Sequence, residues 1–175
     1  MNPTLKESLF SINSYILDPN APKSGDLLAN PRKYFIPIDD RDWIKAIEHD
    51  LDLKYLNGAI VIEYCGSTIM DYRYWDLVDQ LWMYFIHLMG EVDQSGGKAQ
   101  MFFPDQPVRL GLECIGKNDV LFILDDGKWS LPKKEFFQEL VNQAEHFFRR
   151  LQEYFPDQDL AVRPLKEIGQ LKTTL

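Results

Sequence analysis

Carboxylates are the residues of this sequence whose types and positions best suit chemistry. Glu63, Asp71 and Glu113 lie in or beside segments with strand-like composition. Two carboxylates that converge in a pocket can act as general acid and general base. Acids that alternate with apolar residues along a strand, however, usually belong to the solvent-exposed face of a sheet. A small carboxylate-dependent hydrolase therefore stays open as an alternative, and it requires at least two of these side chains to converge.

Motifs for other kinds of catalysis are missing from the sequence. It contains no GxSxG, P-loop or GxGxxG pattern. His49, His87 and His146 fall on expected helices, and none has another His or Cys at metal-ligand spacing. Cys65 and Cys114 lie in apolar stretches without CxxC spacing, which favours two buried free thiols and leaves an inter-strand disulfide as the alternative. We therefore expect no catalytic residue, no metal and no cofactor.

The helix that should organise the core is residues 72–91. Its apolar residues recur at steps of three and four, as in Val78, Trp82, Phe85 and Met89. Further apolar residues widen this stripe around most of the helix, so we expect the helix to be covered on most sides. The positions left to face away from the core are Asp76, Gln80, Met83 and His87.

Two more helices and five strands follow from composition and periodicity. A short helix is opened by Asp39 and Asp40, whose carboxylates suit a first turn. A one-sided amphipathic helix begins at Pro132, which a first turn tolerates, and it ends before Pro156. β-branched and apolar runs predict strands at residues 59–64, 68–72, 99–103, 108–115 and 119–126.

Tight connections between the expected strands favour antiparallel pairing. The predicted fold is a single α+β domain over residues 1–175, with a mostly antiparallel sheet of about five strands. Two long helices and one short helix should pack on one face. Prolines make residues 1–38 an irregular N-terminal arm with one strand candidate at 11–17, and residues 156–175 a C-terminal tail that adds a strand or a short turn.

Composition limits the environment and the partners. The chain has 175 residues, 45% of them hydrophobic, and a net charge of −8. Its N-terminus lacks the features of a signal peptide, and acids interrupt its most apolar helix, so we expect a cytoplasmic protein without a membrane span. A negative surface repels phosphate backbones and attracts basic proteins, which argues against nucleic acid as a ligand.

Negative charge is concentrated in two stretches. Residues 39–52 hold six acids against Arg41 and Lys45, a local charge of −4, and residues 71–93 hold five against Arg73, again −4. Aromatic residues beside such acids are typical interface anchors. The expected partner-binding residues are Asp39, Asp40, Asp42, Asp71, Tyr72, Tyr74, Asp76 and Asp79. The alternative is that these acids serve solubility and helix capping while the tyrosines belong to the core.

Three segments carry a resemblance to a known class of proteins. YWDLVDQLW, FFPDQPVRLGLEC and LPKKEFFQELVNQAEHFFRRL, within residues 58–155, resemble small cytoplasmic bacterial proteins of the polymorphic-toxin immunity type. The resemblance implies an acidic α+β protein that blocks a cognate toxin domain, and it carries over no binding residue. The sequence thus favours a non-enzymatic binding protein for a basic partner, with the hydrolase or a structural homodimer subunit as alternatives.

Overall fold

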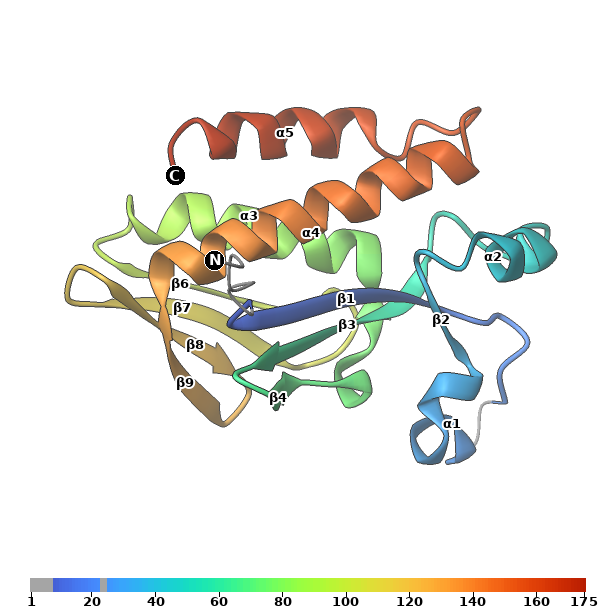
Figure 1. The fold of residues 1–175 in the computed structure, drawn as a ribbon, viewed down its shortest axis with the longest axis horizontal. Helices are drawn as coiled ribbons and strands as arrows, with labels where there is room; N and C mark the ends of the chain where they lie inside the picture. Colours follow the sequence, from blue (N-terminus) through green and yellow to red (C-terminus); the bar gives the residue numbers. More distant parts are fainter. Residues whose placement is uncertain (1–7, 23–24) are drawn as a thin grey trace, which may run out of the picture.

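The computed structural model describes residues 8–22 and 25–175. It confirms the α+β class: helices pack over antiparallel sheets, with α3 and α4 next to the strands and α5 as an outer layer (Figure 1). The sequence predicted one sheet of about five strands, whereas the described residues form nine strands in two antiparallel sheets. The fold therefore has two outward-facing strand surfaces.

Sheet A contains the strands nearest the N-terminus. They are β1 (Phe10–Leu17), β2 (Phe35–Pro37), β3 (Asn57–Tyr64), β4 (Ser67–Met70) and β5 (Asp76–Leu77). The order is β2-β1-β3-β4, with β5 also paired to β3. The strand candidate at 11–17 is thus a central strand of the sheet, and it corrects the irregular arm expected there. Residues 1–7 and 23–24 of that arm lie outside the described residues.

Sheet B is an antiparallel meander. It consists of β6 (Lys98–Phe102), β7 (Arg109–Ile115), β8 (Asp119–Leu124) and β9 (Gly127–Pro132), in that order. The sequence did not predict β9, because Gly127, Lys128 and Ser130 give it the composition of a loop. Its inward-facing residue Leu131 is nevertheless fully buried, and Trp129 lies 5.8 Å from the ring of Phe122.

The three expected helices correspond to α2, α3 and α4, whose ends differ from the prediction, and the described residues also form α1 and α5. The helices are α1 (Asp26–Ala29), α2 (Arg41–Ile47), α3 (Val78–Val92), α4 (Lys133–Tyr154) and α5 (Val162–Lys172), with 3₁₀ turns η1 (Pro31–Lys33) and η2 (Tyr72–Tyr74). The C-terminal tail contains helix α5 rather than a strand or turn. Helix α3 begins at Val78 because Asp71 caps η2 and residues 76–77 pair with β3. Among the described helices, none has the length and apolarity needed to cross a bilayer.

Aromatic rings join the helices to both sheets. Phe122 of β8 lies 6.2 Å from Phe85 of α3 and 5.5 Å from Phe136 of α4, centroid to centroid. Trp82 of α3 is fully buried, and its indole N–H donates to the Ser14 hydroxyl of β1 at 3.0 Å. The Phe122 contacts therefore join sheet B to α3 and α4, and the Trp82–Ser14 hydrogen bond joins the inner face of sheet A to α3.

Candidate binding groove

The outer face of sheet A is hollowed into a groove. Alternation along β1 directs Ile12, Ser14 and Ile16 toward the helices and Asn13 and Tyr15 outward. The cavity holds about 590 Å³. We call it the sheet A groove, and it is lined by Asn13, Tyr15, Arg32, Phe35, Pro37, Asp40, Trp43, Val61, Glu63, Thr68, Asp71 and Tyr72.

Three carboxylates line the sheet A groove, each held by a different local structure. Asp40 caps α2, where its Oδ1 accepts from the Trp43 backbone N–H at 3.1 Å. Asp71 caps η2 by accepting from the Arg73 N–H at 2.9 Å and forms an ion pair with that side chain. Glu63 stands on β3, opposite Thr68 of β4. Among the lining residues only Arg32 is basic, so the groove favours cations.

Aromatic side chains form one wall of the groove. The ring of Tyr72 packs on Tyr15 of β1 and Phe35 of β2, at centroid distances of 5.0 and 4.9 Å. Burial, reinforced by a hydrogen bond with Tyr15, raises the pKa of Tyr72 well above its ordinary value, so its phenol stays neutral. Trp43 of α2 is half-buried. This arrangement suits a Lys or Arg side chain, because the rings and the carboxylates both attract its positive charge.

The groove brings together Asp40, Asp71 and Tyr72 of the eight expected partner-binding residues. Asp42 is exposed in the first turn of α2 but is not part of the lining. Asp39 contacts α4 instead: its Oδ1 lies 2.8 Å from His146 Nε2 and accepts from Arg150 Nε at 2.8 Å. Because two side chains of α4 already contact this carboxylate, Asp39 links the segment before α2 to α4.

The remaining expected residues, Tyr74, Asp76 and Asp79, lie elsewhere. Tyr74 stacks edgewise on Phe103 at 6.5 Å, and Arg73 covers its ring at 5.8 Å. Asp76 was expected to face away from the core, but its residue is 2% exposed. Its carboxylate accepts from the backbone N–H groups of Leu77, Asp105 and Gln106 at 2.6, 3.1 and 2.9 Å. Asp76 therefore holds the β6–β7 connection.

Asp79 lies in the first turn of α3 and is half-buried. Its Oδ1 has no hydrogen-bond partner within the described part of the chain. Burial raises the pKa of this carboxyl, while the N–H groups of Gln80 and Asp79 itself oppose the rise. Asp79 is not among the residues that line the sheet A groove.

The groove also includes residues outside the expected partner-binding set. Tyr15, Trp43 and Glu63 reach it from β1, α2 and β3, and the sequence had indicated Glu63 only for acid–base chemistry. The alternation of polar and apolar residues in SINSYIL could have placed Asn13 and Tyr15 on one exposed face. Of the three carboxylates considered for acid–base chemistry, Glu63 and Asp71 line the same groove, whereas Glu113 pairs with Lys98 at 3.1 Å on sheet B.

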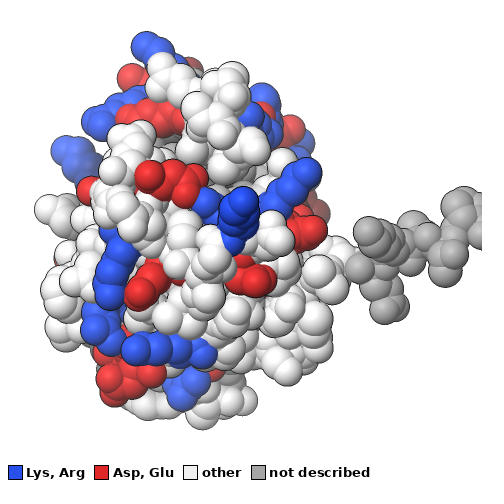
Figure 2. Space-filling model, turned by 90° about the vertical axis from the view of Figure 1, so that its left-hand side faces the viewer, with Lys and Arg blue, Asp and Glu red and all other residues white. Residues whose placement is uncertain are grey.

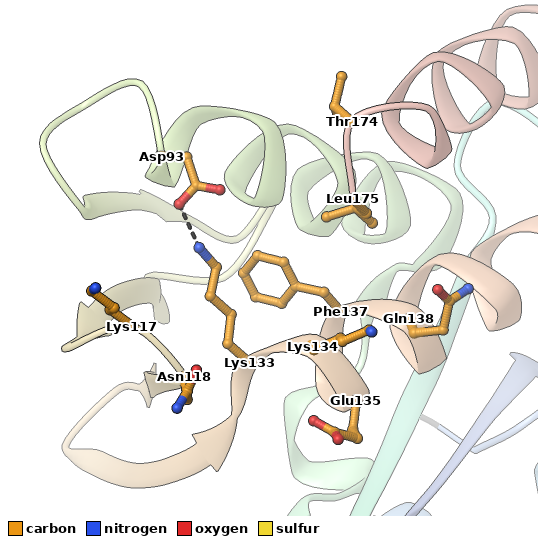
Figure 3. A pocket seen from close by; sticks show the side chains of 10 residues that line it. All are labelled: Asp93, Lys117, Asn118, Lys133, Lys134, Glu135, Phe137, Gln138, Thr174 and Leu175. Carbon is orange, nitrogen blue, oxygen red and sulfur yellow. Dashed lines mark hydrogen bonds and ion pairs between the residues drawn. The ribbon is translucent and has the colours of Figure 1, made fainter.

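A second cavity, of about 420 Å³, lies at the N-terminal end of α4 and has a different charge. Lys117, Lys133 and Lys134 line it, and that end of the molecule mixes basic with acidic side chains (Figure 2). Lys133 Nζ donates to Asp93 at 2.5 Å, while Lys117 and Lys134 point to opposite sides (Figure 3). The three ammonium groups do not converge, so this cavity is not a preformed anion site.

Comparison with protein-family models, with curated proteins and with solved structures finds no match for this chain. Within residues 8–22 and 25–175, no three His, Cys, Asp or Glu side chains are grouped closely enough to hold a metal ion. Cys65 and Cys114 are both free, and Cys65 is exposed rather than buried. The sheet A groove combines concavity, negative charge and aromatic rings, and three of the expected partner-binding residues line it.

Proposed function

We propose that this protein is a non-enzymatic cytoplasmic binding protein whose sheet A groove receives a basic segment of a partner protein. The observation that supports it is the joint lining of one cavity by Asp40, Glu63 and Asp71 with the rings of Tyr15 and Tyr72. The carboxylates attract Lys and Arg during encounter, and the rings offer desolvated anchors once the partner is bound.

The partner that fits this proposal best is a toxin domain with a basic active surface. The protein would then act as an immunity protein, by occluding that surface rather than by altering it chemically. Occlusion requires a rigid face, and the sheet A groove stands on strands that pair along most of their lengths, with Phe10 opposite Tyr64 and Ile16 opposite Gly58. A rigid face loses little conformational entropy when it binds.

Co-purification from the native cell tests this proposal. The tagged chain is captured at about 50 mM and at about 500 mM salt, since charge pairs at a rim are screened within about 8 Å at physiological ionic strength. We expect one basic protein, in near-stoichiometric amount, whose recovery falls at high salt. Recovery only of acidic or neutral proteins, or recovery that is insensitive to salt, would count against the proposal.

A small carboxylate-dependent hydrolase is the second candidate, favoured by the presence of Glu63 and Asp71 in one groove. Both would have to touch the substrate, one as acid and one as base. Glu63→Gln should then abolish turnover of a panel of ester, amide and glycoside substrates. Wild-type protein that turns over none of the panel, while it still binds a basic partner, separates the two candidates in favour of binding.

A further inference from the structure

A third cavity, of about 480 Å³, lies between residues 17–22 and residues 50–57, with Leu27 and Trp75 also in its lining. We call it the connector pocket, and Leu17, Leu27 and Leu51 contribute to its apolar walls. It shares no lining residue with the sheet A groove. Its size falls within the roughly 300–1,000 Å³ of small-molecule sites, which are mainly apolar with a few placed polar groups.

Two aromatic side chains belong to the lining of this pocket. Tyr55 is 61% exposed, although the turn that carries it is fixed by a backbone hydrogen bond from Tyr55 N to Asp52 O at 3.1 Å. Trp75 is half-buried, and its backbone carbonyl accepts from the Gln106 side chain. The fold therefore holds both backbones in place while it leaves much of the Tyr55 ring uncovered.

Carboxylates supply the charged groups of the connector pocket. Asp18, Asp50 and Asp52 line it, and no basic residue does so among the residues that the structure describes. Asp18 Oδ1 accepts from the Asn20 N–H at 2.8 Å, and Asp52 Oδ1 accepts from the Lys54 N–H at 3.0 Å. Each of these two carboxylates is thus oriented through one oxygen by its own turn.

We propose that the connector pocket binds a small organic cation that carries an apolar body, such as an aromatic primary amine. The charged head would lie against Asp18, Asp50 and Asp52, and the apolar body would fill the leucine-lined space beside Tyr55 and Trp75. Charge complementarity selects the cation, because an anion would meet three carboxylates and a neutral ligand would leave them without a counter-charge. This inference does not depend on the function of the sheet A groove.

Phenethylamine, phenethyl alcohol and 3-phenylpropionate form a matched probe set, since they share an apolar body and differ in charge. Each is titrated into the ¹⁵N-labelled full chain. We expect shifts of Tyr55, Asn57 and the Trp75 indole with phenethylamine, at least 10-fold weaker binding of the alcohol, and no binding of the carboxylate.

Two variants in the pocket and one control outside it locate the site. Asp50→Asn combined with Asp52→Asn keeps acceptor oxygens and should weaken phenethylamine binding at least 10-fold, whereas the exposed Asp126→Asn should leave it unchanged. Tyr55→Ala removes an exposed ring and should weaken binding several-fold without unfolding the chain. Equal binding of amine and alcohol, shifts at other residues, or binding of lysine-containing peptides without any binding of phenethylamine would each overturn the proposal.

Discussion

The carboxylates of this protein differ in what their oxygens contact, and these contacts decide their roles. Asp40 caps α2 and Asp71 caps η2, and both also line the sheet A groove, so one carboxylate stabilises a local structure and gives the groove its charge. Asp76 contacts only backbone N–H groups inside the protein. The sequence predicts the same role for these acids, but their burial and hydrogen bonding give them different roles.

Replacing Asp76 should be among the most damaging single substitutions in the chain. Asp76→Ala leaves the N–H groups of Leu77, Asp105 and Gln106 without their acceptor. Hydrogen bonds to a charged group contribute roughly 1.5–3 kcal/mol each, and the losses overlap, so we expect a loss of about 3 kcal/mol. Urea unfolding measures it, with Asp76→Asn as the milder control. An alanine variant as stable as wild type would contradict this role.

Replacing Asp79 should stabilise the protein, whereas replacing Asp76 should destabilise it. Its carboxyl has a raised pKa in the folded state, so ionisation above the unfolded value of 3.8 destabilises the fold, and protonation at lower pH relieves that cost. Asp79→Asn should therefore stabilise the protein at pH 7 by about 1 kcal/mol, because an unsatisfied buried group costs more when it is charged than when it is neutral. The gain should shrink as pH falls toward 3.8. A gain that is constant with pH would exclude ionisation as the cause.

Cys65 adopts a backbone conformation that its side chain disfavours. Its φ is +48° in the two-residue turn between β3 and β4, and Gly66 follows with φ of +78°. Asn-Gly is the preferred pair for such turns. Cys65→Asn should raise the free energy of unfolding by about 1 kcal/mol, and Cys65→Val should lower it by a similar amount. Thermal unfolding under reducing conditions gives both values, and the reverse order would refute the strain argument.

At the scale of elements, the strongly periodic segments were predictable. Helix α4 was expected from the repeat of Phe136, Leu140, Ala144, Phe147 and Leu151, all of which are buried. The start of α3, strand β9 and helix α5 were not predictable in the same way. Their formation depends on tertiary contacts: β5 pairs with β3, β9 pairs with β8 along its length, and α5 packs on α4 and α3.

Helix α5 is attached by few buried residues and by ion pairs. Ile168 and Leu171 are its buried side chains, and Lys172 pairs with Glu145 of α4. Glu167 pairs with Arg163 of α5 at 2.7 Å and His87 of α3 at 2.8 Å. Because these contacts join acidic to basic side chains, the attachment of α5 to α3 and α4 should depend on pH.

Acid should loosen α5 before the rest of the fold. Lys172 and then Arg149 lower the pKa of Glu145, while Arg163 and then His87 lower that of Glu167. Their stabilisation is therefore complete above pH 4.5 and lost as pH falls through the folded pKa values. Hydrogen-exchange protection factors of α5 should fall as the pH is lowered beneath 4.5, while those of α4 persist. Lys172→Met should weaken α5 protection at pH 7, and simultaneous loss in both helices would contradict the account.

At the scale of the whole molecule, the candidate site is a product of tertiary structure. The sequence indicated an acidic, ring-bearing surface, and three of its expected residues, Asp40, Asp71 and Tyr72, line the groove. It could not show that Tyr15 and Glu63 face the same groove, because that follows from the register of β1 against β3. Nor could it show that Asp39 pairs with Arg150, which is 111 residues away in the chain.

The central claim is tested most directly by two variants with the same change in net charge, one with its substitutions inside the groove and one with them outside it. One variant combines Asp40→Asn, Glu63→Gln and Asp71→Asn, which keep the caps and shapes. The control combines Asp42→Asn, Asp126→Asn and Asp157→Asn, all exposed and outside the groove, so both variants carry a net charge of −5, three units above −8. Their affinities for the purified basic partner are measured at one salt concentration. We predict at least 10-fold weaker binding for the groove variant and less than 3-fold for the control, whereas equal losses would show that net charge alone, and not the groove, governs binding.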